Sequence, residues 1–189
     1  VRVVVSRKKL EPNRSGELDP WGVAVVDNAI RRASSHGLKP LVTLWMAPQW
    51  ANGSSDERVP PTSVEGLAAL TSIASRLAAR YDPAVVNNPH GTVDAWEVWN
   101  EPNDPSFMRG TVAPALPAWA PASTPALRTD PSVYARVLTA AYTGFTSHSP
   151  DTTVVFGGTS GTDDVWIDMA LAAGARGNFD VMAVHPYMA

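Results

Sequence analysis

The sequence predicts an α/β fold in which parallel strands are joined by helices that cross from one strand to the next. Short apolar runs alternate with longer segments of helical periodicity along the whole chain. The runs are too uniformly apolar for strands with one face in water, which is typical of parallel strands covered by helices. Five strands are expected, at 1–5, 40–45, 93–99, 153–157 and 180–185.

Polar and aromatic side chains gather directly behind these strands. The segments that follow them are, in chain order, 6–7, 45–50, 100–101, 159–164 and 185–187. Parallel strands bring their carboxyl ends to one edge of the sheet, and a (β/α)8 barrel builds its active site there. No glycine-rich phosphate loop follows the first strand, which argues against a dinucleotide-binding sheet. We therefore predict a partial (β/α)8 TIM barrel, formed by a single, apparently truncated domain, 1–189.

Four segments carry the periodicity of amphipathic helices, namely 20–35, 63–81, 130–148 and 164–173. The first follows Asp19, a favourable N-cap, and stops before Gly37. Its buried face is expected to consist of Trp21, Val25, Ala29 and Ile30. In 130–148 the expected buried face consists of Val133, Val137, Leu138, Ala141 and Phe145. The loop at 102–129, rich in Pro and Ala, has the length of a functional lid or a mobile segment.

The composition narrows the classes of function. The chain has 189 residues, 44% of them apolar and 17% charged, which fits one globular domain with a sizeable core. A net charge of −3 gives no reason to expect a nucleic-acid partner, and no apolar run is long enough for membrane insertion. The sequence contains no cysteine and no other evident cluster of metal ligands, so we predict no metal centre and no cofactor.

Glu101 is the strongest candidate for a catalytic residue. It follows an apolar strand together with Asn100, and Pro102 ends the strand because it has no N–H to donate. Cleavage of a glycosidic bond needs a protonated carboxylic acid at the leaving oxygen and a second carboxylate across the sugar. Glu101 suits the first role, and Asn100 can bind a sugar hydroxyl. The other residues expected to bind substrate are His185, Tyr187, Trp45, Trp50 and Trp99.

The aromatic side chains also have a simpler interpretation. A lone Trp is more often a core residue than a platform for a sugar, and a lone His is more often a satisfied polar group than a catalyst. The grouping of five such residues behind the strands favours the functional interpretation. Glu97 precedes Glu101 by four residues, so it points to the same face but lies deeper in the barrel. We interpret it as a supporting residue, with Arg2 as the partner that a buried charge needs.

The segment 95–103, Ala-Trp-Glu-Val-Trp-Asn-Glu-Pro-Asn, resembles the fourth-strand motif of the clan A glycoside hydrolases. The segment 184–187 resembles the ending of that clan's sixth strand, and 37–44 resembles its third strand. The segments 130–135 and 140–142 are similar to the fourth helix of family 39-like members, which include bacterial exopolysaccharide hydrolases. This resemblance implies a retaining glycosidase for β-linked oligo- or polysaccharides, with Glu101 as acid/base and Asn100 bound to the sugar 2-hydroxyl.

The resemblance also implies that the catalytic nucleophile of the clan is missing from this chain. Members of the clan carry their nucleophile, a second Glu, on the seventh strand, whereas this chain matches strands 2 to 6. We therefore expect the chain alone to be inactive, with two open sheet edges. Two other functions stay open: a non-catalytic carbohydrate-binding barrel, and a lyase or aldolase, which the lack of a suitable Lys or metal cluster disfavours. By analogy secretion is plausible, whereas the sugar, the linkage and the oligomeric state are not predicted.

Overall fold

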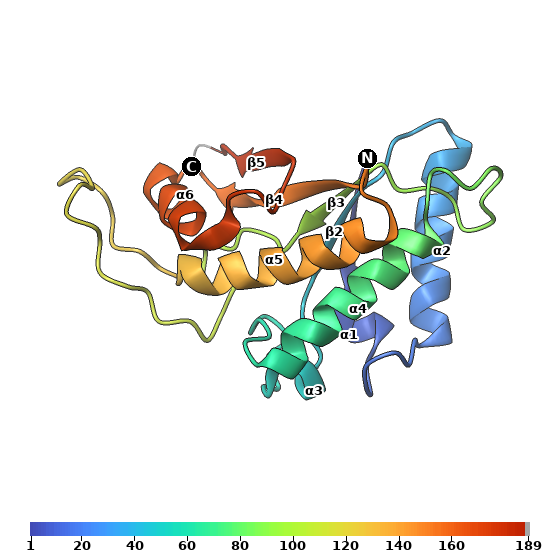
Figure 1. Cartoon of the computed structure of the whole chain (residues 1–189), viewed down its shortest axis with the longest axis horizontal. Coiled ribbons are helices and arrows are strands. Elements are labelled where there is room, and N and C mark those ends of the chain that lie inside the picture. Colours follow the sequence, from blue (N-terminus) through green and yellow to red (C-terminus); the bar gives the residue numbers. More distant parts are fainter. Residues whose placement is uncertain (188–189) are drawn as a thin grey trace.

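The fold is a five-stranded, fully parallel sheet, seen in a computed structural model that describes residues 1–187 (Figure 1). Its strands are β1 (Arg2–Ser6), β2 (Leu41–Trp45), β3 (Ala95–Val98), β4 (Thr153–Ser160) and β5 (Val181–His185). They lie in the sheet in chain order, each strand parallel to the next. This confirms the predicted parallel strands with helical crossovers.

The connections contain the four predicted helices and two short ones. The long helices are α2 (Pro20–Ser35), α4 (Val64–Arg80) and α5 (Pro131–His148), and α6 (Asp164–Ala170) continues into a π-helical turn, η1 (Leu171–Ala175). The helices α1 (Arg7–Leu10) and α3 (Gln49–Asn52) have four residues each. A single turn is too short to show a periodic pattern, and for that reason the sequence did not reveal them.

The predicted start of α2 is correct, but of the four residues predicted for its buried face only Ile30 is buried. The side chain of Asp19 accepts a hydrogen bond from the Gly22 N–H at 2.6 Å, as an N-cap does. Trp21, however, is 68% exposed, and Val25 is exposed as well. The buried residues of α2 are Gly22, Val26, Ile30 and Ala33. The cause is the close approach of α1: a side chain at position 22 would overlap the carbonyl of Lys9, so the Gly22 face turns inward.

The core lies between the sheet and the helices α4 and α5, which run side by side across one face (Figure 1). Trp96 on β3 stacks on Phe145 of α5 with ring centroids 4.8 Å apart. Phe156 on β4 meets the edge of Tyr134 of α5, also at 4.8 Å. All five residues predicted for the buried face of α5 are buried. Within the sheet, the side chains of Arg2, Thr43 and Glu97 on three neighbouring strands are joined by hydrogen bonds. The candidate site lies above them, at the carboxyl ends of the strands.

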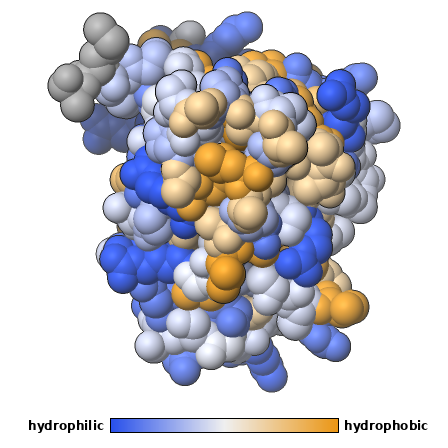
Figure 2. Space-filling view, turned by 90° about the vertical axis from the view of Figure 1, so that its left-hand side faces the viewer, coloured by the Kyte–Doolittle hydropathy of each residue, from blue (hydrophilic) through white to orange (hydrophobic). Residues whose placement is uncertain are grey.

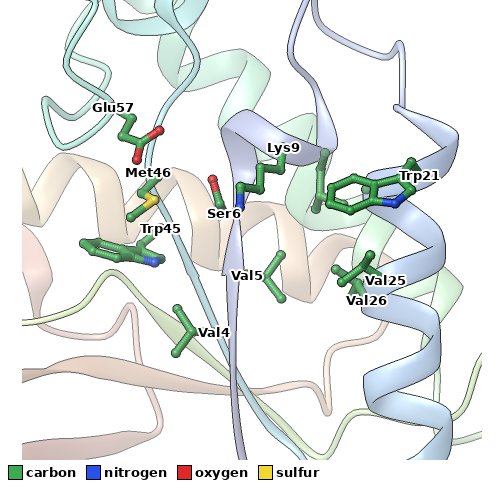
Figure 3. A pocket seen from close by; sticks show the side chains of 12 residues that line it. Val4, Val5, Ser6, Lys9, Trp21, Val25, Val26, Trp45, Met46 and Glu57 are labelled. Atoms are coloured by element: carbon green, nitrogen blue, oxygen red, sulfur yellow. The ribbon is translucent and has the colours of Figure 1, made fainter.

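The two outer strands each pair with one neighbour within residues 1–187. Val4 on β1 is 55% exposed and Val181 on β5 is 47% exposed, so both edges present apolar side chains. Beside β1, a hollow of about 330 Å³ opens between the strand and α2, with Trp21 on one wall and Trp45 on the other (Figure 3). None of the helices in the described part of the chain has the length and hydropathy needed to cross a membrane.

The long loop between β3 and α5 extends away from the body of the molecule (Figure 1). Its two ends are tied together, because the Thr129 hydroxyl donates to the carbonyl of Pro102 at 2.7 Å. The indole N–H of Trp166 on α6 in turn donates to the Thr129 hydroxyl at 2.9 Å. On the side of the molecule from which the loop extends, apolar residues lie among hydrophilic ones (Figure 2).

Candidate active site

The site is built on an unusual turn at the carboxyl end of β3. Trp99 has φ = 70° and Glu101 has φ = 42°, the left-handed region that non-glycine residues rarely adopt. Two neighbouring strands hold the turn: Trp99 N–H donates to Leu44 at 2.9 Å, and Glu101 N–H donates to Gly158 at 3.0 Å. Strained backbone of this kind persists where the surrounding structure fixes it, and it concentrates at functional sites.

The Glu101 carboxyl has one side-chain partner. Its Oε1 lies 2.8 Å from Nδ1 of His185, which ends β5. The side chains of Glu101 and His185 are 16% and 15% exposed, so the pair is largely withdrawn from water but still reachable. Within residues 1–187, Oε2 of Glu101 has no hydrogen-bond partner. One carboxyl oxygen is therefore fixed by the protein and the other is free to meet a ligand.

Glu97 lies deeper in the sheet than Glu101, and both of its carboxyl oxygens accept hydrogen bonds from the protein. Its side chain is 1% exposed and pairs with Arg2 at 2.7 Å. The Thr43 hydroxyl donates to the same oxygen, and the Gly158 N–H donates to the other at 3.1 Å. The structure thus contains the ion pair that we expected between Arg2 and Glu97. A buried carboxylate whose two oxygens both accept hydrogen bonds from the protein has no free oxygen for a ligand.

Asn100 is oriented by the same arginine. Nη2 of Arg2 donates to Oδ1 of Asn100 at 2.7 Å, which leaves the amide Nδ2 without a partner within residues 1–187. Asn100 is 9% exposed, so this free donor lies just below the surface beside Glu101. An amide held by its oxygen and free at its nitrogen is suited to donate to a hydroxyl.

The four predicted aromatic platforms lie in different environments. Trp99 is 3% exposed, and its indole N–H donates to the carbonyl of Phe107 at 3.0 Å. Trp50 stacks on the guanidinium of Arg7 at 5.0 Å and donates to the carbonyl of Glu11 at 2.8 Å, so one face and its polar atom are engaged. Trp45 is half-buried. Tyr187 is 81% exposed, with its ring 5.8 Å from that of His185.

Sequence reasoning missed the groups that support the site from behind. The hydroxyl of Tyr134 donates to the carbonyl of Val98 at 3.2 Å and accepts from the Gly157 N–H at 2.7 Å. Burial raises the pKa of Tyr134 well above its usual value, which keeps the hydroxyl protonated as a donor. Asn103 links the same turn to β4, because it exchanges two hydrogen bonds with the Ser160 backbone. Asn103 and Tyr134 stand within the segments 95–103 and 130–135, which resemble segments of glycoside hydrolases, but no role in the site was predicted for either.

The fold is similar to those of several solved glycosidases. The catalytic domain of GH30 xylanase C from Talaromyces cellulolyticus superposes with a TM-score of 0.59 at 19% identity, over 98% of this chain and 43% of the xylanase chain. A psychrophilic family 10 endo-β-1,4-xylanase gives 0.54 at 16% identity, over 96% and 55%. The exo-β-1,4-mannosidase Op5Man5 from Opitutaceae bacterium strain TAV5 gives 0.54 at 17% identity, over 82% and 24%.

These similarities confirm the predicted fold class. The chain spans about a quarter to somewhat more than half of the length of these neighbours, in line with a partial barrel. At such low identity the comparison establishes the fold alone, and the closer resemblance to family 39 remains a prediction. No model of a known protein family and no curated protein matches the sequence.

Proposed function

We propose that this chain carries the acid/base side of the active site of a retaining β-glycosidase. The observation that carries the proposal is the Glu101 carboxyl, which stands at the carboxyl end of a barrel strand with Oε1 bound to His185 and Oε2 free. Enzymes with this fold place their chemistry at that end of the sheet. The solved structures with a similar fold include xylanases and a mannosidase, which supports a carbohydrate as the substrate.

In the proposed reaction Glu101 acts first as an acid. The proton on Oε2 passes to the glycosidic oxygen while a second carboxylate, the nucleophile, bonds to the anomeric carbon. The bond from that carbon to the glycosidic oxygen breaks, and its electron pair stays on the leaving alcohol. The carboxylate that remains is stabilised by a hydrogen bond from Nδ1–H of His185 to Oε1. In the second step Glu101 takes a proton from the water that releases the sugar, as the retaining mechanism requires.

Three residues would bind the sugar. The free Nδ2 of Asn100 lies beside Glu101, where we propose that it donates to the 2-hydroxyl next to the reacting carbon. Trp45 and Tyr187 each keep ring surface exposed, so we propose them as the stacking faces. The engaged ring of Trp50 and the buried ring of Trp99 make these two less suitable, and we assign them to the support of the site.

A retaining mechanism needs a second carboxyl about 5–5.5 Å from the first. Within residues 1–187, three other acids behind the strands are already engaged by side chains of the protein. Glu57 pairs with Lys8 at 3.1 Å, Asp104 pairs with Arg128 at 3.2 Å, and Asp163 accepts from Asn103 at 3.2 Å. We therefore propose that the nucleophile is supplied by residues outside this chain. The same observation favours a second candidate function, carbohydrate binding without hydrolysis.

Glu101→Gln in the full-length protein tests the proposal. Loss of the acid should lower kcat roughly 10²- to 10⁴-fold on ordinary β-glycosides. The loss should be much smaller on aryl glycosides whose leaving groups depart without a proton. A panel of aryl glycosides and polysaccharides, followed by release of reducing sugar, provides the measurement.

Glu17→Gln is the matched control, because Glu17 is a surface acid paired with Arg14 and should leave kcat unchanged. Equal turnover of Glu101→Gln and wild-type protein would contradict the role of Glu101. A protein that binds oligosaccharides but hydrolyses none of the panel would favour the second candidate.

A further inference from the structure

The strand β4 changes register beside the candidate site. Its pairing with β5 shifts between Phe156 and Thr159, and the two residues in the irregularity are Gly157 and Gly158. A bulge in a strand often redirects side chains next to an active site. Neither glycine has φ in the left-handed region, so the backbone conformation does not explain why position 158 lacks a side chain.

The space at Gly158 is filled by the imidazole of His185. A Cβ built on Gly158 would lie 2.7 Å from Cδ2 and 3.0 Å from Cε1 of that ring, and closer still to Nε2. Real Cβ atoms essentially never come so close to another heavy atom, so either the ring or the strand would have to shift. His185 therefore rests directly on the backbone of Gly158.

Movement of the strand is opposed by the hydrogen bonds of the same residue. The N–H of Gly158 donates to Glu97 at 3.1 Å, and its carbonyl accepts from the Glu101 N–H at 3.0 Å. One glycine thus contacts both acids of the motif and the histidine. Since its peptide groups are fixed, an added methyl group would displace the ring of His185, whose Nδ1 lies 2.8 Å from Glu101.

We propose that Gly158 is a positioning residue for the acid/base. Its lack of a side chain lets the imidazole of His185 lie against β4 and reach Oε1 of Glu101, and this fixes which oxygen of Glu101 is left to transfer the proton. The catalytic part of this inference rests on the proposed function. The placement of the ring by Gly158 does not depend on it.

The test is Gly158→Ala in the full-length protein, with the histidines labelled for NMR. In the wild type, the ring protons of His185 should show nuclear Overhauser contacts to the α-protons of Gly158. In the variant, the ring signals of His185 should shift to those of an imidazole without its carboxyl partner. On a glycoside substrate, kcat should fall roughly 10- to 100-fold with little change in KM, since a misplaced catalytic group costs about that much.

Gly144→Ala is a control for general destabilisation. A Cβ there would lie 2.7 Å from Ala74, in the contact between α4 and α5 and away from the site. It should lower stability but leave the His185 signals unchanged. If Gly158→Ala does not fold, the double variant Gly158→Ala/His185→Ala tests whether the clash is with the ring of His185. Removal of the ring frees the space and should then restore folding.

Unchanged ring signals of His185 in Gly158→Ala would overturn the proposal. So would a double variant that still fails to fold, since the glycine would then serve the strand and not the ring. In the double variant, kcat should be no lower than in His185→Ala alone, because the two changes remove the same contact. A wild-type protein without hydrolytic activity would refute the proposed function, while the NMR result would still decide the role of Gly158.

Discussion

Two glutamates four residues apart, Glu97 in β3 and Glu101 in the turn that follows it, have opposite environments. Glu97 is 1% exposed, and Arg2, the Thr43 hydroxyl and the Gly158 N–H occupy both of its oxygens. Glu101 is 16% exposed and has one partner on one oxygen. The difference follows from depth: the first lies within the sheet, where every polar atom must be satisfied by protein. The second lies where the strand opens into a turn.

The two acids differ in which of their oxygens remain free within residues 1–187. A carboxylate with no free oxygen can organise its neighbours but cannot reach a substrate. Glu97 is connected to the outer turn through two residues that contact its side chain, Arg2 and Gly158. Arg2 bridges Glu97 to Asn100, and Gly158 bridges Glu97 to the backbone of Glu101. The hydrogen bonds of Glu97 with Arg2 and Gly158 thus help to set the positions of Asn100 and Glu101.

The largest expected effect is on stability, from Glu97→Gln. The change leaves the charge of Arg2 without its partner, and because Arg2 is one-third exposed we expect a loss of about 3 kcal/mol, at the low end for a broken buried pair. That corresponds to a fall in Tm of about 6–12 °C for a domain of this size. Glu101→Gln should cost about 1 kcal/mol, since Gln can still accept from His185.

Thermal unfolding of both variants in the full-length protein, followed by circular dichroism, provides the measurement. Equal losses of stability would show that Glu97 contributes no more to the stability of the fold than Glu101, although its surroundings indicate that it does. A larger loss from Glu101→Gln than from Glu97→Gln would reverse the comparison.

Much of this arrangement could be predicted from sequence. The alternation of apolar runs and periodic segments predicted the strands and the long helices, because burial imposes a period on each. The position of Glu97 inside the sheet agrees with the period of two in a strand. Glu101 lies behind the strand as expected, but in a turn in which Trp99 and Glu101 have positive φ, so that period does not extend to it. The buried face of α2 was not predictable, because it depends on how closely Gly22 approaches the backbone of Lys9.

The support of the site was less predictable than its central residue. The hydrogen bonds that Tyr134 donates to Val98 and accepts from Gly157 join segments far apart in the sequence, and no local pattern encodes them. The same holds for the contact of Gly158 with His185, which depends on a change of register between two strands. Local sequence identifies which groups are reactive, whereas tertiary contacts decide which atoms remain free.

Tyr134→Phe tests whether the strands behind the site are held together by this one hydroxyl. Its removal leaves the Gly157 N–H and the Val98 carbonyl without this partner in a fully buried place, so we expect a loss of about 2 kcal/mol in the free energy of unfolding. Denaturant titration gives the value. A loss near zero would mean that water or a shift of β4 replaces the hydroxyl, and that the inner layer is less rigid than we infer.

The smallest expected effects concern two tryptophans. Like the two acids, one of them is engaged in contacts with the protein and the other is partly free. Trp50 is committed to protein contacts, because its N–H donates to Glu11 and its ring stacks on Arg7. Trp50→Phe should therefore lower stability by about 1 kcal/mol and leave the affinity for sugars unchanged. The indole N–H of Trp45 makes no hydrogen bond within residues 1–187. Trp45→Ala should therefore lower the affinity for sugars and leave the stability nearly unchanged. Isothermal titration with oligosaccharides and thermal unfolding of Trp45→Ala and Trp50→Phe separate the two. Weaker sugar binding in Trp50→Phe alone would show that Trp50, and not Trp45, stacks on the sugar. The exposure of a ring would then be a poor guide to sugar binding at this edge of the sheet.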